Sequence, residues 1–225
     1  MDSKRKSYWR RRIQRHLAIA LLAVVLMTVI FYTMSSPNTV FRLSMASAYV
    51  GLGFLAASLV IGPWKVLSGR PNPVSTDLRR DIGIWAGFLG IAHMIIGLQV
   101  HMGGKFWLYF LYPPTQHHVL PIRYDPFGFA NFTGLFASLV LILLLALSND
   151  LSLRTLGTKR WKALQRWNYA GFALMAIHGA AYQLIEKRQL LFVALFVGII
   201  LVAVTIQISG FRSMRIRTRR MGRTL

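Results

Sequence analysis

Two histidines, His93 and His178, lie deep inside long apolar segments of the chain. Ionisable side chains are costly in an apolar environment, so a function is the default hypothesis for them. Each lies about 18 Å along its helix from the basic end of its segment. If both helices run in the same direction, the two imidazoles lie at nearly the same depth. Two neutral imidazoles that face each other across a helical bundle can supply both axial ligands of a haem iron.

Glycines beside both histidines leave space for a flat ligand. Gly90 and Gly97 lie three residues before and four residues after His93, on the same helical face. Gly179 directly follows His178. The other interpretation is that each histidine hydrogen-bonds a neighbouring helix and that the glycines only permit close helix contacts. Matched depth and glycine spacing raise the weight of haem ligation, but the residues alone leave both interpretations open.

The other four histidines are weaker candidates for ligation. His101 lies eight residues after His93, about 80° round the helix and near its outer end. It could hydrogen-bond a haem propionate, act as an alternative ligand, or be solvated. His117 and His118 are adjacent in a loop and, without further ligands, favour no metal site. His16 is expected to be an interfacial residue.

Several classes of chemistry are excluded by what the sequence lacks. It contains no cysteine, which excludes disulfides, thiolate metal sites and iron–sulfur clusters. It also contains no P-loop, no Gly-x-Ser-x-Gly motif and no Gly-x-Gly-x-x-Gly motif after a strand. The apolar segments contain no acidic residue, which argues against a coupled transporter.

The elements that must position the two histidines are six apolar segments, each about as long as a helix that crosses a bilayer. They cover approximately residues 17–34, 44–62, 82–100, 127–148, 167–185 and 190–209. The chain of 225 residues is 55% hydrophobic and has only six acidic residues, too few charges for a soluble surface. We predict an all-α, polytopic membrane bundle of six transmembrane helices at 17–209. A basic cytoplasmic N-terminus at 1–16 and a basic cytoplasmic tail at 210–225 flank it.

The net charge of +21 could indicate nucleic-acid binding, but its distribution favours another origin. Of the 27 Lys and Arg residues, 22 fall at the N-terminus, at 63–80, at 149–166 and in the tail. The remaining five are Arg42, Lys105, Arg123, Lys187 and Arg188. This alternation follows the positive-inside rule for both ends in the cytoplasm. We therefore expect membrane lipid, including anionic head groups, as a partner and no nucleic acid.

The connections carry further expectations. Gly62-Pro63 and the Pro-rich residues that follow Gly69 predict an irregular connector over 63–80. The aromatic run at 106–112 is too short to span a bilayer and suits the head-group region. Residues 186–189 predict a tight turn between the last two segments. The first segment is expected to be retained, because Met34-Ser35-Ser36-Pro37 is a poor signal-peptidase site.

Two stretches resemble the ferric reductase-like transmembrane domain family. One is Arg79-Arg80-Asp81-Ile82-Gly83 with His93, and the other runs from Leu147-Ser148-Asn149 through Arg160-Trp161-Lys162 to His178-Gly179-Ala180. The family includes ferric reductases, NADPH oxidases and the membrane subunit of bacterial methionine-sulfoxide reductase. The resemblance covers about residues 79–185. It implies a six-helix bundle that holds b-type haem between the third and fifth spans, with His93 and His178 as axial ligands.

The resemblance also bears on how many haems are bound. In this family each ligating helix carries two histidines 13 or 14 residues apart, for two stacked haems. Here His93 and His178 take the outer positions, whereas Arg79 and Gln165 stand at the inner positions. The resemblance therefore implies a single haem b, in the outer half of the membrane.

These expectations combine into a functional hypothesis. The chain is predicted to be the electron-transfer component of a reductase system in a bacterial cell inner membrane, passing electrons to an acceptor on the outer side. It shows no flavin or nicotinamide domain of its own, so electrons are expected from a partner redox protein, a membrane quinol, or a bound flavin or quinone. The alternative is a haem-free scaffold or partner-binding subunit that kept the fold.

Overall fold

The computed structural model describes residues 3–69 and 77–221, and these residues are predominantly helical. The helices are α1 (Ser3–Thr33), α2 (Thr39–Leu67), α3 (Asp77–Gly97), α4 (Pro126–Ala146), α5 (Asp150–Gln165), α6 (Trp167–Ile185) and α7 (Leu190–Met221). Two short 3-10 turns, η1 (Met102–Gly104) and η2 (Phe106–Tyr109), lie between α3 and α4. The predicted all-α class is confirmed. The basic residues Arg70 and Arg223 and the connector prolines Pro71 and Pro73 lie outside the described residues.

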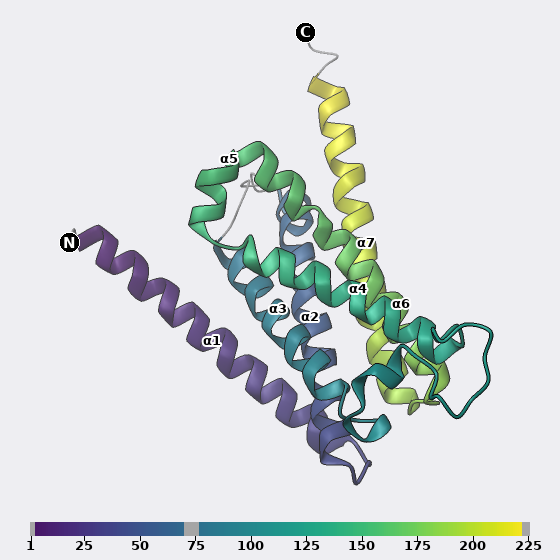
Figure 1. Cartoon of the computed structure of the whole chain (residues 1–225). Helices are drawn as coiled ribbons and strands as arrows, with labels where there is room; N and C mark the ends of the chain where they lie inside the picture. Colours follow the sequence, from purple (N-terminus) through teal and green to yellow (C-terminus); the bar gives the residue numbers. More distant parts are fainter. Residues whose placement is uncertain (1–2, 70–76, 222–225) are drawn as a thin grey trace.

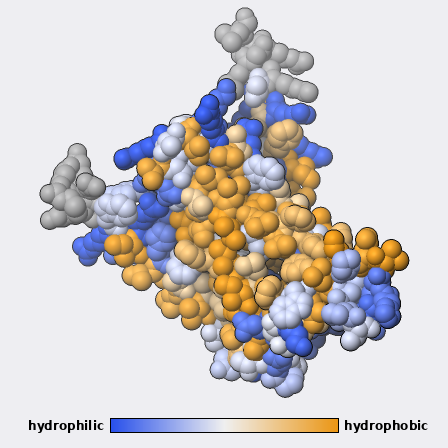
Figure 2. Space-filling model, in the orientation of Figure 1, coloured by the Kyte–Doolittle hydropathy of each residue, from blue (hydrophilic) through white to orange (hydrophobic). Residues whose placement is uncertain are grey.

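Within the described ranges, four helices are long and apolar enough to cross a membrane. They are Ser7–Thr33, Thr39–Leu67, Pro126–Ala146 and Leu190–Thr218. The helices that carry the two deep histidines, α3 and α6, are not among the four, because polar side chains lower their hydropathy. The face seen in Figure 2 is apolar over its middle and hydrophilic toward its ends, as a membrane protein requires.

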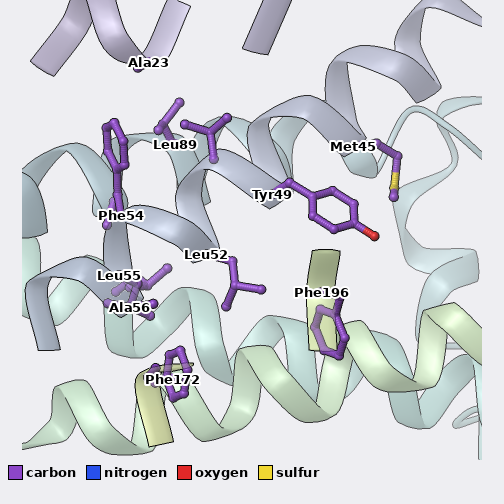
Figure 3. Close-up of a cluster of buried hydrophobic side chains, with 14 of the residues drawn as sticks. Ala23, Met45, Tyr49, Leu52, Phe54, Leu55, Ala56, Leu89, Phe172 and Phe196 are labelled. Atoms are coloured by element: carbon purple, nitrogen blue, oxygen red, sulfur yellow. The ribbon is translucent and has the colours of Figure 1, made fainter. Parts of the chain in front are cut away.

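Helix α2 forms the centre of the bundle. It packs against α1, α3, α6 and α7, while α4 packs against α3 and α6 (Figure 1). Leu52, Leu55 and Tyr49 of α2 are almost fully buried. Figure 3 shows this cluster together with Phe172 of α6 and Phe196 of α7. A helix that is buried on most of its circumference must be apolar all round, as α2 is.

Helix α2 continues through Pro63 to Leu67, so the predicted start of the connector at residue 63 is wrong. Proline has no N–H to give to the carbonyl four residues earlier, which here is that of Leu59. Gln207 of α7 replaces the missing donor, because its side-chain amide donates to the Leu59 oxygen at 2.7 Å. Gly210 allows the close approach, since a Cβ there would lie 2.6 Å from the Pro63 ring. A tertiary contact thus overrides the local helix-breaking signal.

The segment at 149–166, expected to be a loop, contains helix α5. Asn149 caps its start by accepting a hydrogen bond from the Ser152 N–H, and the chain turns at Gly157, whose φ is +69°. Arg80 of α3 fastens this corner to the bundle by donating to the Ser148 carbonyl and to Asp150. The hydrogen bond from Arg80 to the Asp150 carboxylate lowers the pKa of Asp150 below its ordinary value.

The bundle also contains a buried acid, which the hydropathy pattern did not predict. Asp81 lies one residue before the predicted third span, and its side chain is 0% exposed. Three basic side chains of α1 surround its carboxylate: Arg12, Arg15 and His16 lie 3.2–3.4 Å from its oxygens. These contacts attach α1, which is otherwise mostly exposed, to α3. His16 therefore lies against the buried carboxylate of Asp81 and is not simply an interfacial residue.

The last two helices are joined as expected. Helix α6 ends at Ile185 and α7 begins at Leu190, so 186–189 form the predicted tight turn. The two helices nevertheless diverge: α6 packs mainly on α4, and α7 packs mainly on α2. Helix α7 also runs on to Met221, well beyond the predicted end of the sixth span at residue 209.

Candidate functional site

The two deep histidines face each other in the folded chain. The ring centroids of His93 on α3 and His178 on α6 lie 6.0 Å apart, with the ring planes at 69°. A transition metal bonded to one nitrogen of each ring at about 2 Å would hold the centroids roughly 6 Å apart. The separation therefore fits two rings that share one metal ion.

Backbone carbonyls fix which nitrogen of each ring is protonated. Nδ1 of His93 lies 2.9 Å from the Ser44 carbonyl of α2, and Nδ1 of His178 lies 2.7 Å from the Ala130 carbonyl of α4. A carbonyl oxygen only accepts, so each Nδ1 carries the proton and donates. The Nε2 lone pairs of both neutral rings are then free for a metal, which is the arrangement that outer-sphere partners impose on ligating histidines.

A largely apolar cavity of about 400 Å³ surrounds the pair. Its volume lies within the range of about 300–1,000 Å³ that is typical of ligand sites. Its walls come from α2, α3, α4, α6, α7, the loop between α3 and α4, and the turn between α6 and α7. A cavity of this kind, with two convergent imidazoles, suits a large flat apolar ligand that brings its own metal.

Glycines bring the helices close around the cavity. Gly90 and Gly97 both line it, as the spacing predicted, although a Cβ at Gly90 would also lie 2.5 Å from Leu141 of α4. Gly134 of α4 was not predicted. A Cβ there would lie 2.6 Å from Nδ1 of His178. No local signal distinguishes Gly134 from any other glycine in an apolar helix, because its partner is distant in the sequence.

A polar network, also missed in the sequence, lies on one wall of the cavity. Tyr182 donates to the Asn131 side-chain oxygen at 2.8 Å, and its ring centroid is 5.0 Å from that of His178. Gln183 donates to the Tyr49 hydroxyl at 2.8 Å, which in turn donates to a backbone carbonyl of α7. These bonds satisfy polar groups that would otherwise be costly to bury, while the side-chain oxygen of Gln183 is buried without a partner.

His101 lies at the outer edge of the cavity but not on the helix of His93. Helix α3 ends at Gly97, so the expected position 80° round the same helix is wrong. The His101 backbone N–H donates to the Tyr109 hydroxyl, and its Nε2 lies 3.3 Å from Glu186. Burial raises the pKa of the Tyr109 hydroxyl above its usual value. The imidazole of His101 thus already lies beside a carboxylate of the same chain, that of Glu186.

The remaining histidines lie away from the cavity walls. His118 stacks on Tyr112 with ring centroids 3.5 Å apart, and its Nδ1 lies 3.1 Å from the Tyr124 hydroxyl. Across the described part of the chain, no group of three or more His, Asp or Glu side chains could hold a bare metal ion. Two imidazoles can complete the coordination of a metal whose other ligands come from a macrocycle, which is the situation in haem.

Arg79 and Gln165, which stand at the inner ligand positions of the family pattern, lie outside the histidine cavity. Gln165 is the last residue of α5, and only Arg166 separates it from α6; its side-chain nitrogen is buried without a hydrogen-bond partner. Arg79 lies in the first turn of α3. Neither residue lines the cavity between His93 and His178.

Comparison with known proteins identifies a relative of this chain. The chain is 31% identical, over 176 residues, to the "Protein-methionine-sulfoxide reductase heme-binding subunit MsrQ" of Rhodospirillum rubrum. The match covers 77% of this chain and 73% of the relative. No protein-family model matches the chain, and no solved structure matches it. The match to this relative, over most of both sequences, shows that the chain belongs to the MsrQ family of heme-binding subunits.

Proposed function

We propose that this chain binds one haem b between α3 and α6 and serves as the electron-transfer subunit of a membrane reductase system. The observation that carries the proposal is the facing pair His93 and His178, 6.0 Å apart in an apolar cavity. The relative from Rhodospirillum rubrum, which is named as a heme-binding reductase subunit, supports the same cofactor.

The residues of the chain have distinct roles in this proposal. His93 and His178 are the axial ligands, and the carbonyls of Ser44 and Ala130 hold their rings in the required tautomer and orientation. Bound haem supplies an iron that changes oxidation state by one electron. The apolar walls exclude water, and Gly90 and Gly97 leave clearance on the face of His93.

We further propose six spans over 17–209 with both termini in the cytoplasm. Figure 1 supports this arrangement, since the N-terminus, the C-terminal end of α7 and α5 lie toward one end of the bundle. The α1–α2 turn, the α3–α4 loop and the α6–α7 turn lie toward the other. Helices α3 and α6 would cross despite their polar residues, because those face the bundle interior.

The single haem then occupies the outer half of the membrane, in a multi-pass protein of the bacterial inner membrane. The inner positions, Arg79 and Gln165, offer no imidazole for a second one. Electrons would enter from a partner redox protein, a quinol, or a bound flavin or quinone near the basic inner segments. They would leave to an acceptor beside the outer loops.

An absorption spectrum tests the proposal against the alternative of a haem-free scaffold. We expect the purified chain, produced with an adequate haem supply, to show a Soret band and a haem-to-protein ratio near one. A chain without the band would support the scaffold, and a ratio near two would refute the single-haem arrangement.

A methyl group at Gly134 is expected to weaken haem binding. In Gly134→Ala, the new Cβ would lie 2.6 Å from Nδ1 and 2.7 Å from Cε1 of His178, so the ring must move and lose its bond to Ala130. Altering such an outer-sphere partner costs about 10–100-fold in metal affinity. Haem titration of the protein, followed at the Soret band, measures the change.

Gly53→Ala is the matched control for this substitution. Gly53 lies in α2, and a Cβ there meets nothing within 4 Å. Alanine in a helix interior stabilises by about 0.5–1 kcal/mol over glycine, so this variant should keep full haem affinity. Equal haem affinities for the two variants would contradict the role assigned to Gly134.

A further inference from the structure

Arg188, in the turn between α6 and α7, brings a positive charge to the edge of the histidine cavity. Apart from the histidines, it is the only Lys, Arg, Asp or Glu side chain among the described residues that line this cavity. Its guanidinium carbon lies 4.5 Å from the ring centroid of Phe41, which also borders the cavity. The stacking holds the planar group in place over an aromatic face.

Among the described residues, no acidic side chain forms a salt bridge with this guanidinium. Its Nε is buried without a hydrogen bond. The nearest acid in the sequence, Glu186, is engaged by His101. Burial lowers the pKa of Arg188 from its ordinary value, and the nearby Glu186 charge offsets only part of that shift. A half-buried, unpaired cation is costly to maintain, and an anionic ligand would remove that cost.

Arg188 also lies between two cavities of different character. A second cavity of about 480 Å³ shares Phe41, Val100, His101 and Arg188 with the first. Its other walls include serines, an asparagine, a glutamine, Glu186 and Lys187. A ligand with an apolar body and a carboxylate edge would place its body in the first cavity and its carboxylates at this boundary.

We infer that Arg188 binds a carboxylate of the haem and so orients the propionate edge toward the α6–α7 turn. This inference rests on the proposed function, and it assigns to Arg188 the role that the sequence suggested for His101. Guanidinium is suited to it, because its planar fork matches the two oxygens of a carboxylate. His101 contacts Glu186 and lines the same cavities as Arg188.

The test compares haem with its dimethyl ester, which has the same ring but no carboxylate. Both are titrated into the full-length chain produced without added haem. Wild type should bind haem about ten- to a hundredfold more tightly than the ester, as expected for a charged hydrogen bond. Arg188→Leu should lose that preference while keeping its affinity for the ester. Arg188→Lys, which retains the charge, should keep part of the preference.

Arg42→Leu is the matched control. Arg42 also stacks on a phenylalanine, Phe31, at 4.1 Å, and its Nε is also buried without a hydrogen bond. It does not line either cavity, so its variant should discriminate haem from the ester as wild type does.

Three outcomes would overturn the inference. Equal binding of haem and ester by wild type would do so, and this comparison decides alone if Arg188→Leu does not fold. Equal losses for both ligands in Arg188→Leu would show a structural role instead. A wild-type chain that binds neither ligand would overturn the proposed function as well, which separates the two failures.

Discussion

Replacing either His93 or His178 with alanine is expected to abolish the haem absorption of the purified protein. Each variant removes one of the two imidazoles that line the cavity from different helices, so only one axial ligand would remain for the haem iron. The loss should exceed the about 10–100-fold cost of altering an outer-sphere partner. The measurement is the Soret absorbance per chain after purification with adequate haem.

His118→Ala is the control for this pair. His118 lies on the loop between α3 and α4, stacked on Tyr112, and does not border the cavity. Its variant should keep the full haem content. If His93→Ala retained the band unchanged, the pairing of α3 with α6 around one haem would be wrong. Comparable melting temperatures for the three variants without haem would show that the helical bundle is intact.

Replacing Asp81 with alanine is expected to destabilise the protein by about 3–5 kcal/mol, the usual cost of removing one partner of a buried ion pair. Arg12, whose side chain is only 10% exposed, would be left near Arg15 and His16 without the carboxylate between them. Trp85 donates a hydrogen bond to Nδ1 of His16, so the proton of this ring is on Nε2. That nitrogen lies 3.3 Å from a carboxylate oxygen of Asp81. Thermal unfolding in detergent measures the loss.

Asp77→Ala separates this effect from a general loss of negative charge. Asp77 lies on the same helix and also contacts Arg15, at 3.4 Å, but its side chain is 41% exposed. Exposed ion pairs contribute only about 0–1 kcal/mol, so this variant should melt close to wild type. Similar unfolding of the two aspartate variants would mean that the cluster around Asp81 does not anchor α1.

Much of the fold follows from local patterns in the sequence. Hydropathy and length located six of the seven helices, because an apolar run of bilayer length has few alternatives to a helix. The errors are misplaced helix ends and one missed helix, α5. Helix α2 passes Pro63 because Gln207 supplies the missing donor, and α5 forms in a segment too polar for a hydropathy search. Both depend on partners or caps that an average over a window does not include.

Some residues of the candidate site can likewise be predicted from the sequence, and others can be found only in the tertiary structure. The residue types and depths of His93 and His178 are visible in the sequence, and so is the spacing of Gly90 and Gly97, because each is a property of one helix. The approach of Gly134 to His178 is a contact between α4 and α6, and no pattern within either helix encodes it.

The sequence by itself therefore determined the helical class, the apolar segments and the two histidines at matched depth. Only the tertiary structure decided that Ser44 and Ala130 present carbonyls to those rings, that Glu186 engages His101, and that Arg188 stays unpaired at the cavity edge. The physical reason is that helical periodicity and hydropathy are short-range properties of the chain. Hydrogen-bond partners in a packed interior often come from residues far apart in the sequence. The two histidine–carbonyl pairs are separated by 48 and 49 positions.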